Sequence, residues 1–402
     1  MSKKLGLAVA SALLAAASSA NAGIVIPAGD WTLDINGNVN AYYIHNRSSD
    51  NNTIDGGLAN KESDSAGTPD SGATSINTGL LPSWLGVTGK TRQNDLDVEF
   101  TISLQPGASG KTSLAGGGGN ENRQAYIAFG DKSWGTIKIG KDLGVFGRDA
   151  ILNDMTLLGV GSQGIVGRAG GTTTTLGRIG TGFLYADFNG QINYTSPNWN
   201  GFSFVVGVDQ PLSTLNLGTS AASSGAQKSP GFVGNASYAW GGDVAGKVWL
   251  EAKTQQADYG AAIGDERATA WGIGANVNVA GFGLTGYYYD GKGVGTTAWM
   301  MDGVSVAGKR RDSDGGYVQA TYTIPGVGTK IGASWGISKL DTAGGEVNPT
   351  LVEENEMWTV GAYHPLTKHL NLVAEYSNVQ SENQAGQDND SDIMSVGAIL
   401  FF

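Results

Sequence analysis

The residues that could support catalysis are few, and their settings do not suit it. The chain has three His and no Cys, so a thiolate nucleophile and a thiolate-bound zinc or iron–sulfur site are excluded. The sequence GASWG at 332–336 matches the nucleophile pattern G-x-S-x-G, and GVGSQG at 159–164 matches the dinucleotide pattern G-x-G-x-x-G. Both patterns need a helix directly after the glycine turn, and neither segment predicts one. We therefore expect no catalytic residue and no cofactor.

The possible metal ligands are also scattered. His364 and His369 lie around a proline-containing turn, and His45 is far away in the chain. A zinc site needs three or four convergent ligands. The run DNDSD at 388–392 begins like a calcium loop but lacks the later Gly and the bidentate Glu. We expect no specific metal site.

The overall composition narrows the class of protein. The 402 residues include 64 Gly, and 25 Lys and Arg stand against 36 Asp and Glu, for a formal net charge of -11. This balance, without any basic run, argues against nucleic acid as a partner. The abundance of Gly, with 10 Trp and 14 Tyr, is typical of a β protein with many turns and aromatic surface belts.

The first 22 residues have the pattern of a secretory signal peptide. Lys3 and Lys4 precede an apolar run over 5–17, and the small residues Ala20 and Ala22 predict cleavage before Gly23. No apolar stretch in 23–402 approaches the ~18 residues that a membrane helix needs. We therefore expect one exported domain over 23–402, and any membrane insertion must use a β-barrel.

Strand periodicity supports a barrel. Residues 96–105 alternate strictly between apolar and polar types, and 248–253, 317–324 and 370–377 behave similarly. In an outer-membrane barrel the apolar face meets lipid and the polar face lines a wet lumen. Asp97, Glu99 and Glu251 fall on the polar face.

The chain divides into sixteen strand segments, joined alternately by short turns and long loops. That alternation is the sidedness of bacterial outer-membrane barrels. We predict an all-β fold, a transmembrane antiparallel 16-stranded β-barrel, with one short helix near 148–157. The predicted strands are 31–44, 79–91, 96–106, 122–130, 136–141, 183–196, 202–209, 231–240, 247–256, 267–280, 284–290, 315–324, 329–339, 356–364, 370–379 and 392–402.

The last predicted strand has a distinctive end. Its alternate apolar positions run from Met394 to Phe402, and it resembles the terminal strand that the outer-membrane assembly machinery recognises through a final aromatic residue. An open barrel would leave unpaired backbone groups in hydrocarbon. This strand must therefore pair with the first, near 31–45.

Four short motifs carry a family resemblance. They are NRQAYIAFG at 122–130, WGTIKIGK at 134–141, LGVTG at 85–89 and INYTSP at 192–197. In this order and spacing the chain resembles Gram-negative general diffusion porins. The resemblance implies a homotrimer of barrels in the bacterial outer membrane, in contact with membrane lipid and lipopolysaccharide, that passes ions and small hydrophilic solutes passively. A substrate-selective channel is the alternative, followed by a non-transport surface β protein.

The resemblance also implies a constriction. In the family the third external loop, here about 142–181, folds inward, and its acidic residues face arginines on the wall. Asp154 stands where the family carries a loop acid, and Arg123 stands where it carries a wall arginine. Trp84 and Ala186 instead occupy positions where the family often has Arg, so the usual selectivity does not transfer.

Other cations could replace the missing arginines. The segment 138–178 contains Lys138, Lys141, Arg148, Arg168 and Arg178, and two nearby acids, at 142 and 149, counter part of this charge. With Trp84, Arg123 and Asp154 they form the predicted constriction set. This mixture of cations and acids does not determine the sign of ion selectivity.

Overall fold

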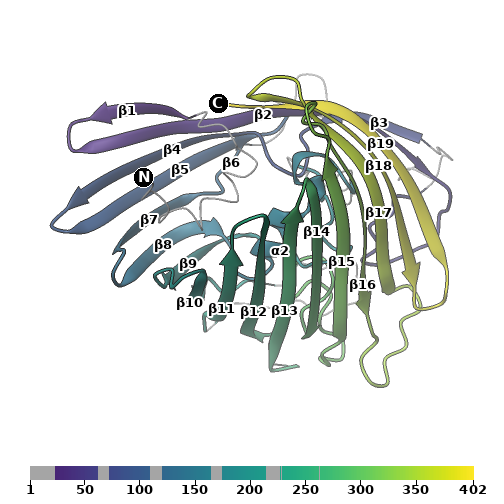
Figure 1. The fold of residues 1–402 in the computed structure, drawn as a ribbon. Coiled ribbons are helices and arrows are strands. Elements are labelled where there is room, and N and C mark those ends of the chain that lie inside the picture. The colour runs from purple at the N-terminus through teal and green to yellow at the C-terminus, as the bar shows by residue number, and fades with distance from the viewer. Residues whose placement is uncertain are drawn as a thin grey trace.

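The described residues form one closed antiparallel sheet. The computed structural model describes residues 23–61, 72–108, 120–163, 174–213, 227, 229–261 and 263–402, and these contain nineteen strands in a single curved sheet (Figure 1). Three of them, β1, β3 and β6, are short additions, and the other sixteen close into a ring. The predicted 16-stranded barrel is confirmed.

The strands are β1 (Ile24–Ala28), β2 (Trp31–Ser48), β3 (Gly72–Asn77), β4 (Trp84–Gln93), β5 (Leu96–Pro106), β6 (Asn120–Glu121), β7 (Ala125–Asp131), β8 (Gly135–Leu143), β9 (Phe188–Thr195), β10 (Phe202–Asp209), β11 (Gly231–Trp240), β12 (Val244–Asp258), β13 (Asp265–Val279), β14 (Phe282–Lys292), β15 (Asp312–Thr323), β16 (Lys330–Leu340), β17 (Val352–Pro365), β18 (Leu370–Asn383) and β19 (Asp388–Phe401). The helices are α2 (Arg148–Asn153) and the 3-10 helix η1 (Met155–Leu158). In the described ranges, no helix combines the length and the apolar character that crossing a membrane would require.

The barrel closes where its last strand meets its first. β19 pairs with β2 from Ser391 opposite Ser48 to Phe401 opposite Asn38, as the alternating pattern predicts. One residue further, the Gly37 N–H donates to the Phe402 carbonyl at 2.8 Å, and the Phe402 N–H donates to the Gly37 carbonyl at 3.0 Å. β1, which the sequence did not predict, continues along the same edge of β2.

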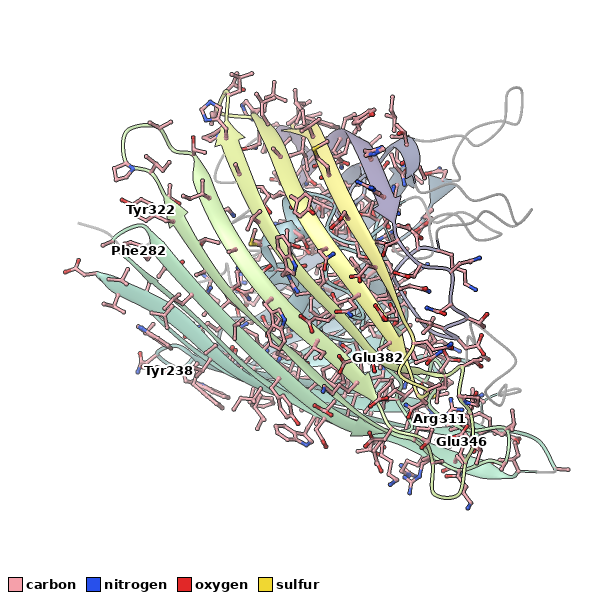
Figure 2. The ribbon with its side chains drawn as sticks, turned by 90° about the vertical axis from the view of Figure 1, so that its right-hand side faces the viewer. Tyr238, Phe282, Arg311, Tyr322, Glu346 and Glu382 are labelled. Atoms are coloured by element: carbon pink, nitrogen blue, oxygen red, sulfur yellow. The ribbon has the colours of Figure 1, made fainter. Side chains whose placement is uncertain are left out.

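The two faces of the sheet differ as the alternation requires. On the outer face Ile102, Leu250 and Leu284 are each more than half exposed, whereas Trp249 and Glu251 on the inner face are buried. Figure 2 shows Phe282 and Tyr322 toward one end of the strands, and Arg311, Glu346 and Glu382 toward the opposite end, where the long connections lie. An exposed apolar outer face is what a lipid-facing barrel presents.

Two predicted strands start later than expected. The strand expected over 79–91 begins at Trp84, and the one expected over 183–196 begins at Phe188. The residues before them are apolar but lie inside the barrel, where Leu80, Phe183 and Leu184 are buried. Short apolar runs fit a strand or a packed loop equally well, so only the tertiary contacts separate the two. The helix expected over 148–157 is confirmed as α2 followed by η1.

The Gly37 site gives a test of closure. A Cβ at Gly37 would lie 2.1 Å from the Trp84 carbonyl oxygen and 2.9 Å from the Phe402 ring, whereas a Cβ at the outward Gly286 would meet nothing within 4 Å. We expect Gly37→Ala to destabilise the barrel by about 1–3 kcal/mol through overpacking, and Gly286→Ala to be neutral. Urea unfolding followed by the heat-dependent gel shift of the barrel measures both. Equal stability of the two variants would contradict the close approach at Gly37.

Candidate pore constriction

The third long connection runs inside the barrel. It leaves β8, forms α2 and η1, and returns to β9. Its described residues hydrogen-bond to inward-facing side chains of β11, β12, β15, β16 and β18 and to a backbone carbonyl of β17. Figure 1 shows α2 within the curve of the strands. We call residues 144–163 and 174–187 the inner loop.

A buried carboxylate on β12 holds the beginning of the inner loop. Glu251 accepts a hydrogen bond from the Gly147 N–H at 3.0 Å and from the Tyr287 hydroxyl at 2.8 Å. Next to it, Asp149 of α2 forms an ion pair with Lys247 of β12 at 2.5 Å and accepts from Asn235 of β11 at 3.1 Å. Gly147 precedes the helix with φ of 77°, a left-handed conformation that favours glycine.

A second carboxylate holds the far end of this segment. Glu375 of β18 accepts from the Val160 N–H at 2.7 Å, from the Gly161 N–H at 2.9 Å and from the Tyr363 hydroxyl at 2.6 Å. Between the two carboxylates, the Gln319 side chain of β15 donates to the Asn153 carbonyl at 3.0 Å and accepts a hydrogen bond from the Met155 N–H at 2.6 Å. These contacts fix the inner loop against the β11–β18 wall.

Asp154 and Arg178 also hold the loop. Asp154 is 4% exposed and accepts from the Thr156 N–H at 3.0 Å and from the Arg178 N–H at 3.3 Å. Burial raises the pKa of Asp154, although the positive charge of Arg178 opposes the rise. Arg178 is fully buried, and its guanidinium donates to the Met357 carbonyl at 2.9 Å and to Ser334. Both residues, predicted to line the constriction, are therefore buried and bind the inner loop to itself and to the wall.

Lys138 lies on the inner face of the opposite wall. It pairs with Asp142 of the same strand, and its ammonium lies 4.4 Å from the centre of the Tyr126 ring. The neighbouring Ile139 points outward and is 38% exposed, which confirms the direction of Lys138. Lys138 is thus the predicted cation that the structure places on the lumen wall of β8.

Arg123 and Lys141 lie together at the rim. Arg123 is 9% exposed, donates to Glu121 at 2.8 Å and lies over the Phe188 ring at 5.4 Å. Lys141 has the outward parity of Ile139 and donates to the Asn122 carbonyl at 2.7 Å. Both line a hollow of about 200 Å³ with Tyr185 and Asp187. Lys141 therefore lies at the rim beside Arg123, and not on the lumen wall with Lys138.

The remaining predicted residues divide three ways. Trp84 faces inward and donates its ring N–H to Asn36 at 3.3 Å. Arg148 starts α2, is half-buried, and has no hydrogen bond or ion pair to another described residue. It shares a helix face with Leu152, one turn later, while Asp149 and Ala150 are buried. Arg168 lies outside the described residues.

Other long connections narrow the same end of the barrel. The Leu58 N–H, in the connection after β2, donates to Asn355 and Ser381 of the wall. In the connection after β14, Trp299 is buried, and the ammonium of Lys253 lies 4.9 Å from the centre of its ring. Arg311, fully buried, then joins this connection to Glu346 of the next one, with a 3.0 Å bond from its Nε. We call 293–311 and 341–351 the mouth loops.

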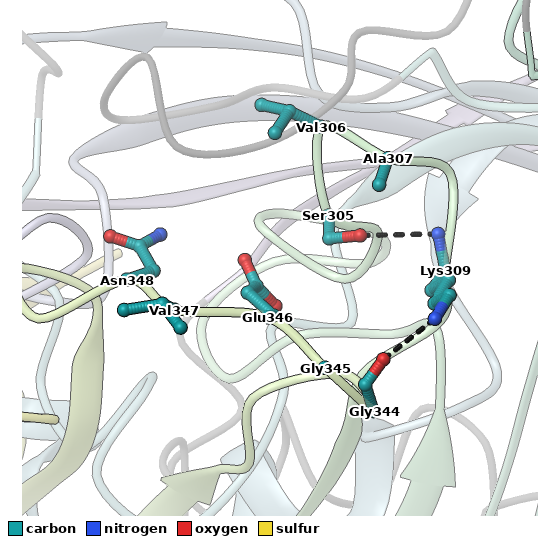
Figure 3. A pocket seen from close by; sticks show the side chains of 9 residues that line it. All are labelled: Ser305, Val306, Ala307, Lys309, Gly344, Gly345, Glu346, Val347 and Asn348. Carbon is teal, nitrogen blue, oxygen red and sulfur yellow. Dashed lines mark hydrogen bonds between the residues drawn. The ribbon is translucent and has the colours of Figure 1, made fainter.

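The mouth loops enclose a hollow of about 350 Å³ (Figure 3). Lys309 bridges its two sides, because its N–H donates to Ser305 at 3.1 Å and its ammonium donates to the Gly344 carbonyl at 2.7 Å. Val347 on its border is 93% exposed. This hollow lies among the long connections and not among the residues predicted to line the constriction.

A closed barrel with a lipid-type outer face, a polar inner face and an infolded loop defines an outer-membrane channel. A family model described as Gram-negative porin matches residues 8–384. The chain belongs to the Gram-negative porin family. It forms an outer-membrane channel for passive diffusion of ions and small hydrophilic solutes.

Solved structures with the same fold include several channels. One is the outer membrane channel DcaP of Acinetobacter baumannii, with TM-score 0.68, 15% identity, and coverage of 95% of this chain and 100% of that one. Another is an anion-selective porin from Comamonas acidovorans, with TM-score 0.62, 16% identity, and coverage of 92% of this chain and 100% of that one. A third is Salmonella typhi OmpF in complex with daunomycin, with TM-score 0.59, 15% identity, and coverage of 94% of this chain and 100% of that one. A comparison with curated protein sequences found no match.

The sequence missed the residues that hold the inner loop. Alternation assigns Glu251 and Glu375 to the inner face, and it identified Glu251 as a lumen carboxylate. Nothing in a two-residue period tells an inward carboxylate that faces water from one that binds a loop backbone. The burial of both, at 1% and 4% exposed, comes only from the packed loop.

Glu375 gives a test of loop anchoring. We expect Glu375→Leu to leave two loop N–H groups without their acceptor and to cost about 2–3 kcal/mol of loop stability. The barrel should still fold, but the inner loop should be cut faster by protease and the single-channel current should become noisier. Glu356→Gln, on the outer face of β17, is the matched control. Unchanged proteolysis and noise in Glu375→Leu would show that Glu375 does not anchor the loop.

The mouth loops give a pH prediction. Burial alone would raise the pKa of Glu346, but hydrogen bonds from Arg311 and from the Ala343 N–H, with the charge of Arg311, outweigh it and the pKa is lowered. A carboxyl with a lowered folded-state pKa adds stability above its unfolded pKa and loses it as pH falls through the folded value. We expect hydrogen-exchange protection of 305–311 to persist at neutral pH and to fall below about pH 4. Glu346→Gln should abolish this pH dependence, and an unaltered profile would contradict the role of the pair.

Proposed function

We propose that solutes pass between the free face of α2 and the wall formed by β4, β5, β7 and β8. The observation that carries this proposal is the one-sided anchoring of the inner loop. Most of its hydrogen bonds to the barrel wall go to β11–β18, and Tyr42 of β2 and Arg123 before β7 bind it only at its edges. On the opposite wall Lys90 and Glu99 keep side-chain exposures of 56% and 32%. Arg148, without a described partner, lies on the half-exposed face of α2. The constriction then sets a weak ion selectivity.

We also propose a homotrimer that uses the β2–β8 side of the barrel. Outward aromatic pairs such as Tyr194–Phe204, Phe282–Tyr322 and Trp358–Tyr376 lie on β9–β18, where they suit the membrane interfaces. On β2–β8 one such pair, Trp31–Phe100, is present among the described residues. β7 and β8 are also short, with 7 and 9 residues against 15 in β12 and β13. A low wall with few aromatic pairs suits a second copy better than lipid.

The remaining expectations stand as proposals. Residues 1–22 act as a cleaved signal peptide, and lipopolysaccharide contacts the outer face. The contact of Phe402 with the assembly machinery stays a prediction. We propose no enzymatic activity, in line with the family and with the settings of the histidines: His45 and His364 each bond to a threonine hydroxyl.

Planar-bilayer recording tests the proposed function. We expect the purified folded protein to insert with current steps in groups of three and to show a small reversal potential under a salt gradient. Arg148→Glu should shift that potential toward cation preference, because it reverses a charge next to the passage. Lys339→Glu, on the outer face, should leave it unchanged. Folded protein without conductance would contradict the channel, and an unshifted Arg148→Glu would remove Arg148 from the constriction.

A further inference from the structure

The lumen wall opposite the inner loop carries an unbroken series of polar contacts. Lys90 of β4 pairs with Glu99 of β5 at 3.5 Å. Glu99 accepts from the Tyr126 hydroxyl of β7 at 3.0 Å, and the Tyr126 ring lies under the ammonium of Lys138 of β8. Lys138 in turn pairs with Asp142, which accepts from Gln124 at 3.0 Å. We call Lys90, Glu99, Tyr126, Lys138 and Asp142 the charge ladder.

The strand register explains why these side chains meet. Lys90 lies opposite Glu99, Glu99 opposite Ala128, and Ala128 opposite Lys138. Directly opposed residues on one face of antiparallel strands have close Cβ atoms, so their side chains interact. The outward neighbours Ile102, Ile127 and Ile139 are exposed to the lipid side, which places the whole row on the lumen side.

The ladder is reachable from the lumen. The side chains of Lys90 and Glu99 are 56% and 32% exposed, and that of Lys138 is 23% exposed. One step along the strands, Arg92 continues the pattern by pairing with Asp97 at 2.8 Å and with Asp131 at 3.0 Å. In contrast, the charged groups of the other wall, such as Glu251 and Glu375, are buried under the inner loop.

The signs of the charges alternate along this surface. Every cation of the ladder has a carboxylate within an ion-pair distance, so the field of one sign is largely cancelled a short way from the wall. An ion of a single sign therefore gains little from the surface as a whole. A solute with both signs can bring its ammonium to a carboxylate and its carboxylate to the adjacent lysine at the same time.

We propose that the charge ladder is a specificity-determining surface that favours small zwitterionic solutes, such as α-amino acids, over neutral solutes of equal size. Each ion pair of the ladder presents two opposite charges side by side. In the Lys90–Glu99 pair these charges are 3.5 Å apart, a spacing similar to that between the ammonium and the carboxylate of one α-amino acid. The inference rests on the proposed function and adds the solute class. It does not require the constriction to carry charges of only one sign.

The test compares two solutes of matched size in one measurement. Proteoliposomes with the purified channel are swollen in alanine, a zwitterion, and in lactamide, which is neutral, and the ratio of the two rates is taken. We expect the ratio to fall about threefold in Glu99→Gln and also in Lys138→Gln, the size expected of one exposed charge pair. Lys339→Gln, which breaks the Lys339–Glu354 pair on the outer face, should keep the ratio of the unaltered protein.

Reversal potentials of the same variants make the test specific. Glu99→Gln should shift ion preference toward anions and Lys138→Gln toward cations, while both lower the alanine ratio. A filter that responds only to net charge would shift the reversal potentials but leave the ratio of alanine to lactamide unchanged, because neither solute has a net charge, and an unchanged ratio would overturn the proposal. If either variant does not fold, Lys90→Gln, at the most exposed position, replaces it. Absence of swelling by the folded, unaltered channel would instead defeat the proposed function.

Discussion

The constraint behind this structure is that backbone N–H and C=O groups within a membrane must pair with each other. A sheet satisfies this only when it closes, and here closure depends on the seam between β19 and β2. The seam extends to the mutual hydrogen bonds of Gly37 and Phe402, where a side chain on Gly37 would collide with the Trp84 carbonyl. Because the ring is complete, its inner face becomes a separate polar compartment, and the loops have somewhere to fold.

Within that compartment, two buried carboxylates hold the inner loop against one wall of the lumen. Glu251 and Glu375 bind backbone N–H groups at the two ends of the α2–η1 segment, and Asp154 and Arg178 hold its interior. Buried charges are costly unless they are paired or hydrogen-bonded, and here the loop backbone supplies the partners. The consequence is an asymmetric lumen, with one wall covered by the loop and the charge ladder left accessible on the other.

This arrangement separates two kinds of charge that look alike in the sequence. Asp154 and Arg178 sit in the inner loop, where the resemblance to porins placed pore-lining groups, yet both are almost fully buried. Lys138 and Glu99 are ordinary members of alternating strands, yet they remain reachable by solute. In the proposed passage, selectivity depends on which charges the loop covers, and that is a property of packing.

The residue pattern by itself determined the barrel, because a two-residue period and the turn residues reflect local backbone geometry that each strand carries alone. It also predicted the short helix near 148–157 and the pairing of the last strand with the first. It could not separate Phe183 and Leu184 from the following strand, or distinguish the anchoring role of Glu375. Those outcomes depend on contacts between residues far apart in the chain, such as Glu375 with Val160, and only the tertiary structure brings such partners together.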